Sequence, residues 1–192
     1  MALTRLDEKT ALIVIDLQKG VAGMAIAHPS AEIVSRAAAL AEAFRRRLPV
    51  VLVNVDSMAP GRTEQAPNLR AFPADWTELV PELNRRPTDH TVTKRTWGAF
   101  TGTGLNEHLR GLGVTEVVIP GIATSAGVES TARQEHELGY NVALAVDAMT
   151  DRSAEAHANS VARIFPRLGE TGTTEEIIAL LEANAAAKPA SR

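Results

Sequence analysis

The sequence predicts a three-layer α/β protein built on a doubly wound, mainly parallel sheet. Short, continuous apolar runs suit strands buried on both faces, and they alternate with segments of helical periodicity. Aromatic residues make up only 4% of the chain, so Ala, Val, Ile and Leu must build the core that covers such a sheet. The length of 192 residues fits one domain, and we expect a single domain over residues 1–192.

The first part of the chain has the pattern strand, helix, strand. Residues 11–15 form an apolar run that ends at Asp16. A helix is predicted from Ser30, which can cap its start, to the arginines at 45–47, which suit the negative end of the helix dipole. The next buried strand is predicted at 49–54. Parallel strands joined by a helix imply a right-handed crossover.

Residues 56–90 interrupt this alternation with a long segment that is rich in proline and arginine and lacks strong periodicity. Such a segment is usually a functional loop, a lid or an assembly surface. Its prolines and arginines include Pro60, Pro67, Pro73, Pro81, Pro87, Arg62, Arg70, Arg85 and Arg86. Any of these arginines could close over an anionic substrate. For most of them we prefer an exposed or subunit-facing position.

The second half of the chain resumes the alternation of strands and helices. Its predicted elements are a strand at 91–94, a helix at 105–112, a strand at 116–119, a helix at 124–138, a strand at 142–146, and helices at 153–164 and 174–181. Pro120-Gly121 is expected to end the 116–119 strand, and Asp147 the 142–146 strand. The tail at 185–192 is expected to fray.

Composition restricts the partners and the location that we expect. The formal net charge of -3 argues against nucleic acid as the main partner. No apolar run approaches the ~20 residues of a membrane span, and the N-terminus has no signal-peptide pattern, so we expect no membrane partner and a cytoplasmic location. The chain has no cysteine, which excludes disulfides and a thiolate nucleophile. The five histidines lack metal-ligand spacing, and we expect neither metal nor cofactor.

Polar residues lie at or just after the carboxyl ends of several predicted strands, where doubly wound sheets bind ligands. They are Asp16, Asn54, Lys94 and the turn at Gly121. Asp16 follows a fully apolar strand, and partial desolvation would suit its carboxyl group to general acid or base catalysis. The alternative is a capping role. Lys94 could bind a substrate carboxylate or tune Asp16, and its alternative is an exposed lysine at a strand end.

Residues 120–133 form a strand–turn–helix junction. The first N–H groups of a helix lack internal partners and favour negative charge, which suits an oxyanion or carboxylate hole. The alternative is an ordinary helix start, capped by Thr124 or Ser125, with Gly127 present for close packing. Ser125 and Ser130 are less favoured as nucleophiles because no histidine base can be assigned to them.

Taken together, these segments resemble the isochorismatase-like (cysteine hydrolase) superfamily over roughly residues 8–182. The resemblance rests on Leu12-Ile13-Val14-Ile15-Asp16-Leu17-Gln18, Lys94-Arg95-Thr96-Trp97-Gly98-Ala99-Phe100, Gly121-Ile122-Ala123-Thr124, and Glu137-Leu138-Gly139-Tyr140 leading into Val146-Asp147-Ala148. It implies a Rossmann-type topology, hydrolase chemistry, and self-association into a homodimer or larger assembly. It also implies a non-proline cis peptide bond at Ile122-Ala123.

The superfamily's catalytic set is an aspartate, a lysine and a cysteine. Asp16 and Lys94 match the first two, whereas Gly127 stands at the cysteine position. Isochorismatases proper also lack the cysteine and hydrolyse a vinyl ether without a covalent intermediate. By this resemblance Asp16 would protonate the enol-ether carbon, Lys94 would bind a substrate carboxylate, and the turn amides near Gly127 would orient other oxygens. The residues expected to contact the substrate are Gln18, Asn54, Trp97, Ile122, Ala123 and Thr124.

Two questions stay open at the level of sequence. A neighbouring Lys94 ammonium would lower the pKa of Asp16, whereas an acid role needs that pKa raised. The function is expected to be hydrolysis of a small, anionic, carboxylate-bearing substrate, with vinyl ethers as a candidate class. The alternatives are an inactive metabolite-binding or scaffold member, and an amidase whose cysteine was replaced. The segment after Lys94 differs from that of isochorismatases proper, which leaves the substrate unassigned.

Overall fold

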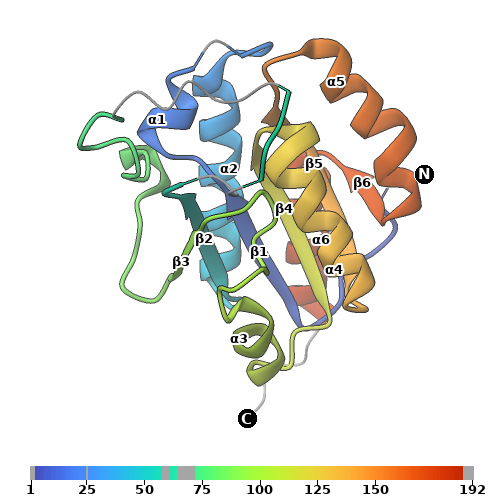
Figure 1. Cartoon of the computed structure of the whole chain (residues 1–192). Coiled ribbons are helices and arrows are strands. Elements are labelled where there is room, and N and C mark those ends of the chain that lie inside the picture. Colours follow the sequence, from blue (N-terminus) through green and yellow to red (C-terminus); the bar gives the residue numbers. More distant parts are fainter. Residues whose placement is uncertain (1–2, 25, 58–60, 65–71, 188–192) are drawn as a thin grey trace.

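A computed structural model describes residues 3–24, 26–57, 61–64 and 72–187. These residues form a six-stranded sheet in the order β3-β2-β1-β4-β5-β6, with helices on both faces (Figure 1). The strands are β1 (Thr10–Ile15), β2 (Val50–Val55), β3 (His90–Lys94), β4 (Glu116–Ile122), β5 (Asn141–Thr150) and β6 (Glu170–Gly172). Neighbouring strands are parallel throughout the sheet. The predicted doubly wound α/β fold is therefore confirmed.

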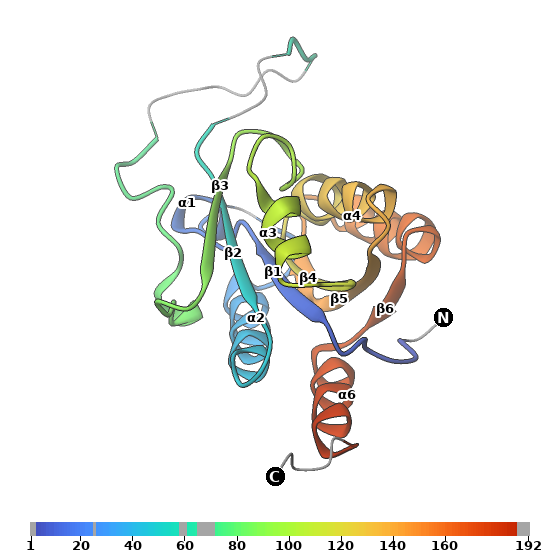
Figure 2. The same ribbon diagram turned by 90° about the horizontal axis from the view of Figure 1, so that it is seen from below.

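Helices cover the two faces of the sheet as separate layers. The helices are α1 (Lys19–Ala22), α2 (Ser30–Arg45), α3 (Leu105–Gly111), α4 (Glu129–Glu137), α5 (Ala154–Asn159) and α6 (Thr174–Ala187). Figure 2 places α3 and α4 on one side of the sheet and α2 and α6 on the other. Short 3-10 turns occur at η1 (Pro81–Leu83) and η4 (Phe165–Arg167), and π-helical turns at η2 (Thr124–Val128) and η3 (Ser160–Ile164).

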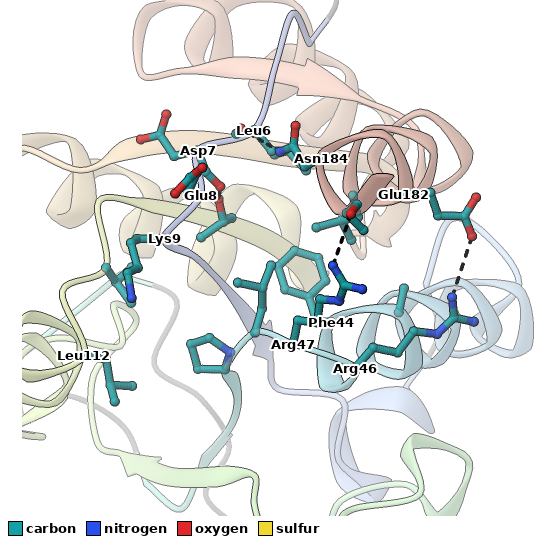
Figure 3. Close-up of a pocket in the computed structure, with 17 residues that line it drawn as sticks. Leu6, Asp7, Glu8, Lys9, Phe44, Arg46, Arg47, Leu112, Glu182 and Asn184 are labelled. Atoms are coloured by element: carbon teal, nitrogen blue, oxygen red, sulfur yellow. Dashed lines mark hydrogen bonds and ion pairs between the residues drawn. The ribbon is translucent and has the colours of Figure 1, made fainter. Parts of the chain in front are cut away.

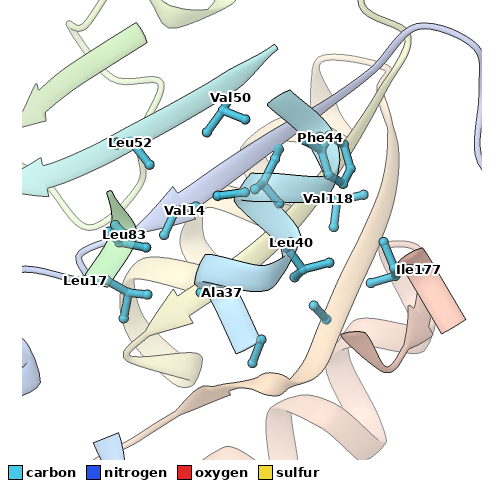
Figure 4. Packing of buried hydrophobic residues seen from close by; sticks show 14 of the residues in the cluster. Val14, Leu17, Ala37, Leu40, Phe44, Val50, Leu52, Leu83, Val118 and Ile177 are labelled. Atoms are coloured by element: carbon cyan, nitrogen blue, oxygen red, sulfur yellow. The ribbon is translucent and has the colours of Figure 1, made fainter. Parts of the chain in front are cut away.

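Apolar side chains of the strands alternate between two cores, because successive residues of a strand point to opposite faces. On the α2 and α6 face, Leu12 and Val14 of β1 join a cluster with Leu40 and Phe44 of α2. Figure 4 shows Val14, Leu40 and Phe44 of this cluster. On the other face, the alternate residues of β1 pack with α3 and α4. Aliphatic residues predominate in both clusters, as the low aromatic content predicts.

Two strands extend beyond their predicted ends. The prediction that Pro120-Gly121 would end a strand is wrong, because β4 continues to Ile122. A register shift between Ile119 and Gly121 lets proline sit inside a strand that pairs on both sides. β5 likewise passes Asp147 and ends at Thr150, since its last residues pair with the end of β4.

Gly121 brings β1 and β4 together near the carboxyl edge of the sheet. Its φ is 139°, a conformation that favours glycine. A methyl group at this position would overlap the carbonyl oxygen of Ile15. The glycine therefore permits a close approach just before β1 gives way to Asp16.

The helix predicted over 124–138 is the π-turn η2 followed by α4, and the one predicted over 153–164 is α5 followed by η3. The segment at 56–90 contains η1, and its Leu79 pairs with Gln18 in an isolated bridge. Pro60, Pro67 and Arg70 of this segment lie outside the described residues. α6 includes 185–187 of the predicted frayed tail, and 188–192 are not described. Within the described residues, no helix combines the length and the apolar character needed to cross a membrane.

Candidate active site

The candidate site lies at the carboxyl edge of the sheet, where the strand order switches direction between β1 and β4. Asp16 directly follows β1, Lys94 is the last residue of β3, and Gly127 lies in the η2 turn after β4. The Lys94 ammonium reaches across β2 to Asp16, and the Nζ–Oδ2 distance is 2.8 Å. Both side chains are almost fully buried, with 2% of Lys94 and 7% of Asp16 exposed. Doubly wound sheets bind ligands at this kind of switch point.

The backbone fixes the direction of Asp16. Its N–H donates to the carbonyl of Val53 at 2.9 Å, which ties the end of β1 to β2. Its φ of 52° lies in the left-handed region, which aspartate tolerates better than most side chains. The chain turns here immediately after leaving the sheet. Such conformations cluster at functional sites, where the surrounding structure holds them.

Burial and the Lys94 charge have opposite effects on the pKa of Asp16, and the effect of burial is the larger. Desolvation raises the pKa of its carboxyl group to about 6, although the charge and the hydrogen bond of Lys94 lower it. Oδ2 accepts from Lys94, whereas the buried Oδ1 has no hydrogen-bond partner among the described residues. The Lys94 ammonium also donates to the carbonyl of Thr96 at 3.1 Å. Asp16 is thus a carboxyl group that can hold a proton near neutral pH, with one oxygen uncommitted.

Gly127 packs directly against this pair. A methyl group on it would lie 3.1 Å from Asp16 Oδ2, 3.1 Å from Ile15 Cγ2 and 3.6 Å from Lys94 Nζ. The first two distances are shorter than ordinary van der Waals contacts, so a side chain at Gly127 would require Asp16 and Ile15 to move slightly. Glycine at this position therefore allows the ion pair and the turn to approach each other closely.

The η2 turn begins at the cis peptide bond between Ile122 and Ala123, which confirms the expected cis bond. The carbonyl of Ala123 accepts from the amides of Ala126 and Val128, both at 3.1 Å. These bonds fold the turn so that Gly127 lies against Asp16 and Lys94.

Two residues that the sequence interpretation missed hold this turn. The carboxylate Oδ2 of Asp151 accepts from the N–H of Ser125 at 2.7 Å and from its hydroxyl at 2.8 Å. His157 Nδ1 lies 2.9 Å from the hydroxyl oxygen of Thr124. Asp151 follows the carboxyl end of β5 as Asp16 follows β1, and the strand end predicted at 146 concealed this parallel. A histidine does adjoin the turn, but at Thr124 rather than at Ser125.

Other predicted substrate contacts are occupied by protein partners or lie at the surface. The buried amide of Gln18 donates to the carbonyls of Val55 and Trp76, both at 3.0 Å, and accepts from the Val55 N–H at 2.8 Å. Asn54 donates to the carbonyl of Thr77 and accepts from the hydroxyl of Thr93. Trp97 is 57% exposed, whereas Ile122 and Thr124 are buried. Gln18 and Asn54 therefore anchor the 72–80 segment over the carboxyl edge.

A separate hollow of about 590 Å³ lies at the opposite, amino edge of the sheet (Figure 3). Its lining includes Lys9 before β1, Pro49 before β2, and Arg46 at the end of α2. Arg46 pairs with Glu182 of α6 at 3.7 Å, so the charges of this rim are partly matched. The hollow does not include Asp16, Lys94 or Gly127. No group of three or more His, Asp and Glu side chains within the described ranges could hold a metal ion.

Comparisons with known proteins agree with the fold. The family model of the isochorismatase domain matches residues 10–176. The chain is 43% identical over 179 residues to the uncharacterized isochorismatase family protein YwoC of Bacillus subtilis (strain 168), covering 89% of this chain and 93% of that protein. It is 41% identical over 177 residues to the corresponding uncharacterized protein YecD of Escherichia coli O157:H7, covering 88% and 94%. The solved structure of an isochorismatase family protein from Burkholderia thailandensis superposes with a TM-score of 0.89 at 38% identity, covering 93% and 98%.

Proposed function

Because the chain belongs to the isochorismatase family, we propose that it is a hydrolase in which Asp16 acts as a general acid on a small, carboxylate-bearing substrate. The observation that carries this proposal is the buried Asp16–Lys94 pair against a glycine turn. A cysteine-free site cannot form a thioester, so the substrate must be hydrolysed without a covalent thiol intermediate. Vinyl ethers are the candidate substrate class.

The Asp16 carboxyl group has the properties that an acid needs. Its pKa of about 6 leaves about a tenth of the molecules protonated at pH 7. Oδ1, which lacks a partner among the described residues, is the atom that would carry and deliver the proton. A substrate carboxylate bound to Lys94 would offset the ammonium charge and raise the pKa of Asp16 further. Substrate binding would thereby increase the fraction of acid in the reactive form.

A vinyl ether would react by proton transfer, addition of water and breakdown of a hemiketal. The proton of Asp16 forms a C–H bond at the terminal methylene carbon, and the electron pair of the double bond is consumed in that bond. Water adds to the resulting oxocarbenium carbon and loses one proton, which returns to Asp16. The hemiketal then breaks its C–O bond to the leaving group, and its hydroxyl proton is transferred to the departing oxygen, which gives a ketone and an alcohol. Lys94 and the Gly127 amide would hold the oxygens of the substrate during these steps.

The alternative function is a family member that binds a metabolite or serves as a scaffold without catalysis. The replacement of the usual nucleophile by Gly127 favours it. The amidase alternative needs a cysteine at Gly127, whose Cβ would lie 3.1 Å from both Asp16 Oδ2 and Ile15 Cγ2, so these two neighbours would have to move by a few tenths of an ångström. Activity that depends on Asp16 would separate the first proposal from both alternatives.

The test is a screen of the purified protein against carboxylate-bearing vinyl ethers, esters and amides, with Asp16→Asn as the variant. We expect Asp16→Asn to lower kcat by about 10²–10⁴-fold, the usual value of a positioned acid. Asp56→Asn is the matched control, because Asp56 also follows a strand but is 30% exposed and pairs with Arg95 at 3.3 Å. This control should retain activity.

The pH dependence of the same reaction gives a second measurement. Because the acid form is needed, kcat/KM of the wild type, which reports the protein without substrate, should fall as pH rises through about 6. A rate that increases through that pH would identify Asp16 as a base instead. Turnover that survives in Asp16→Asn, or no turnover of any substrate class, would contradict the proposed function.

A further inference from the structure

Asp151 is an unusual carboxylate because it is nearly buried, with 5% exposed, yet it receives backbone and hydroxyl donors rather than a cation. Oδ2 accepts from the N–H and the hydroxyl of Ser125, and Oδ1 accepts from the N–H of Ser153 at 3.3 Å. No lysine or arginine pairs with it among the described residues. Three of its acceptor positions are thus used to join the end of β5, the start of α5 and the η2 turn.

The η2 turn depends on this support from outside. It is a π-helical turn, a form that is rare and usually limited to a single turn. Its first two residues are both bonded to neighbouring elements, Ser125 to Asp151 in the β5–α5 connection and Thr124 to His157 in α5. Ser125 lies two positions before Gly127. Because Asp151 bonds directly to Ser125, a shift of its carboxylate would move the turn.

The contact between the turn and the ion pair is sensitive to small displacements. A methyl group on Gly127 would already lie only 3.1 Å from Asp16 Oδ2, so the turn backbone fits closely over the carboxylate. Asp16 is only 5% exposed in this packing. A turn displaced outward would loosen the contact, open the carboxylate to water and misdirect the turn amides.

We propose that Asp151 is a positioning residue of the candidate site, which fixes the Thr124–Val128 turn against the Asp16–Lys94 pair with His157 as a second support. The geometric part of the proposal concerns the folded protein alone. Its consequence for turnover rests on the proposed hydrolase function. The two can therefore fail separately.

The experiment is an NMR titration of the Asp16 carboxyl carbon in the full-length protein, assigned by its loss in Asp16→Asn. The variant is Asp151→Asn, which replaces one carboxylate oxygen by an amide NH₂ that cannot accept. Glu116→Gln is the matched control. Glu116 is also 5% exposed, and its Oε2 accepts from the N–H of Asp7 at 2.6 Å and the hydroxyl of Thr10 at 2.7 Å. It lies at the opposite end of β4 from the turn.

We expect Asp151→Asn to lower the pKa of Asp16, because water then reaches the carboxylate, and Glu116→Gln to leave it unchanged. With a hydrolysed substrate in hand, Asp151→Asn should lower kcat about tenfold or more while KM changes less. An unchanged titration of Asp16 in Asp151→Asn, or an equal shift in both variants, would overturn the positioning role. If Asp151→Asn does not fold, Ser125→Ala removes only the hydroxyl bond and should shift Asp16 in the same direction by less. Absence of Asp16-dependent turnover in the wild type would refute the proposed function but leave this titration valid.

Discussion

Glu135 of α4 illustrates at the scale of a single residue how burial acts without an opposing charge. Its side chain is fully buried, and neither carboxyl oxygen has a hydrogen-bond partner within the described part of the chain. Desolvation raises the pKa of this group well above its ordinary value. Burial therefore favours the neutral, protonated form of Glu135 in the folded protein more than in the unfolded chain.

This difference predicts a stabilising substitution. The folded protein binds the Glu135 proton more tightly than the unfolded chain does, so the free energy of unfolding falls as pH rises above 4.5. Glu135→Met keeps a similar volume without a buried polar group and should stabilise the fold by about 1–3 kcal/mol at pH 7–8. Urea denaturation measures the effect, which should grow with pH. Glu137→Met on the exposed side of α4 is the control, and an equal effect there would contradict the explanation.

The central residues of the candidate site could be predicted from sequence, and the outer ones could not. Asp16 and Lys94 each follow a short run of strand type, and parallel strands bring their carboxyl ends together. The role of Gln18 depends on the Trp76 carbonyl, which belongs to a segment without periodicity. The raised pKa of Asp16 depends on total burial, a quantity that local sequence does not specify. The partners of Gln18 and the pKa of Asp16 therefore depend on long-range packing, which the sequence pattern does not show.

At the scale of elements, a buried ion pair attaches the segment before β3 to α2. Arg45 contacts Asp89 with two hydrogen bonds, from Nε to Oδ1 at 3.0 Å and from Nη2 to Oδ2 at 2.8 Å. Their side chains are 7% and 1% exposed. Asp89 also accepts from the Arg86 N–H at 2.7 Å, and Arg45 donates to the Leu83 carbonyl. This pair fixes the end of the 56–90 segment to α2, directly before β3 begins.

Removing one partner of this pair should be costly. Asp89→Ala leaves the Arg45 guanidinium buried without its carboxylate, and we expect a loss of about 3–5 kcal/mol in the free energy of unfolding. Thermal or urea denaturation measures the loss. Glu42→Ala removes an exposed partner of the same arginine and should cost about 1 kcal/mol or less. Similar losses in both variants would show that burial is not the cause.

Element types were easier to predict than element boundaries. The strongly periodic α2 and the apolar β1 lie where the pattern indicates. β4 was predicted too short because a bulge accommodates Pro120, and a bulge is visible only in the pairing of two strands. β6 was not predicted because it has only three residues, too few to show a strand pattern. Boundaries therefore followed from tertiary pairing rather than from local preference.

At the scale of the whole molecule, alternation of strands and helices predicts the class of fold because a parallel sheet requires crossover connections. The alternation does not predict the order β3-β2-β1-β4-β5-β6, because this order depends on which edge of the sheet each new strand joins. The reversal after β3 moves β4 to the other side of β1. This choice creates the switch point at which Asp16, Lys94 and Gly127 meet.

Self-association is the prediction that belongs to this scale. The resemblance to the superfamily implies a homodimer or larger assembly, and Trp97 is a large apolar side chain that is 57% exposed. Sedimentation velocity at micromolar concentration should therefore give a mass of at least twice the 20.5 kDa of the chain. A species of chain mass at every concentration tested would contradict this expectation.

The central position of β1 also has a consequence for how the chain is made. β1 leaves the ribosome long before β4, one of its two neighbours, whose Glu116 pairs with Thr10. While the intervening residues are translated, β1 can pair with β2 but keeps an open edge on its other side. Unpaired, apolar strand edges recruit other chains. The open edge of β1 therefore stays available to other chains until β4 emerges, and a translational pause between the two strands would prolong that exposure.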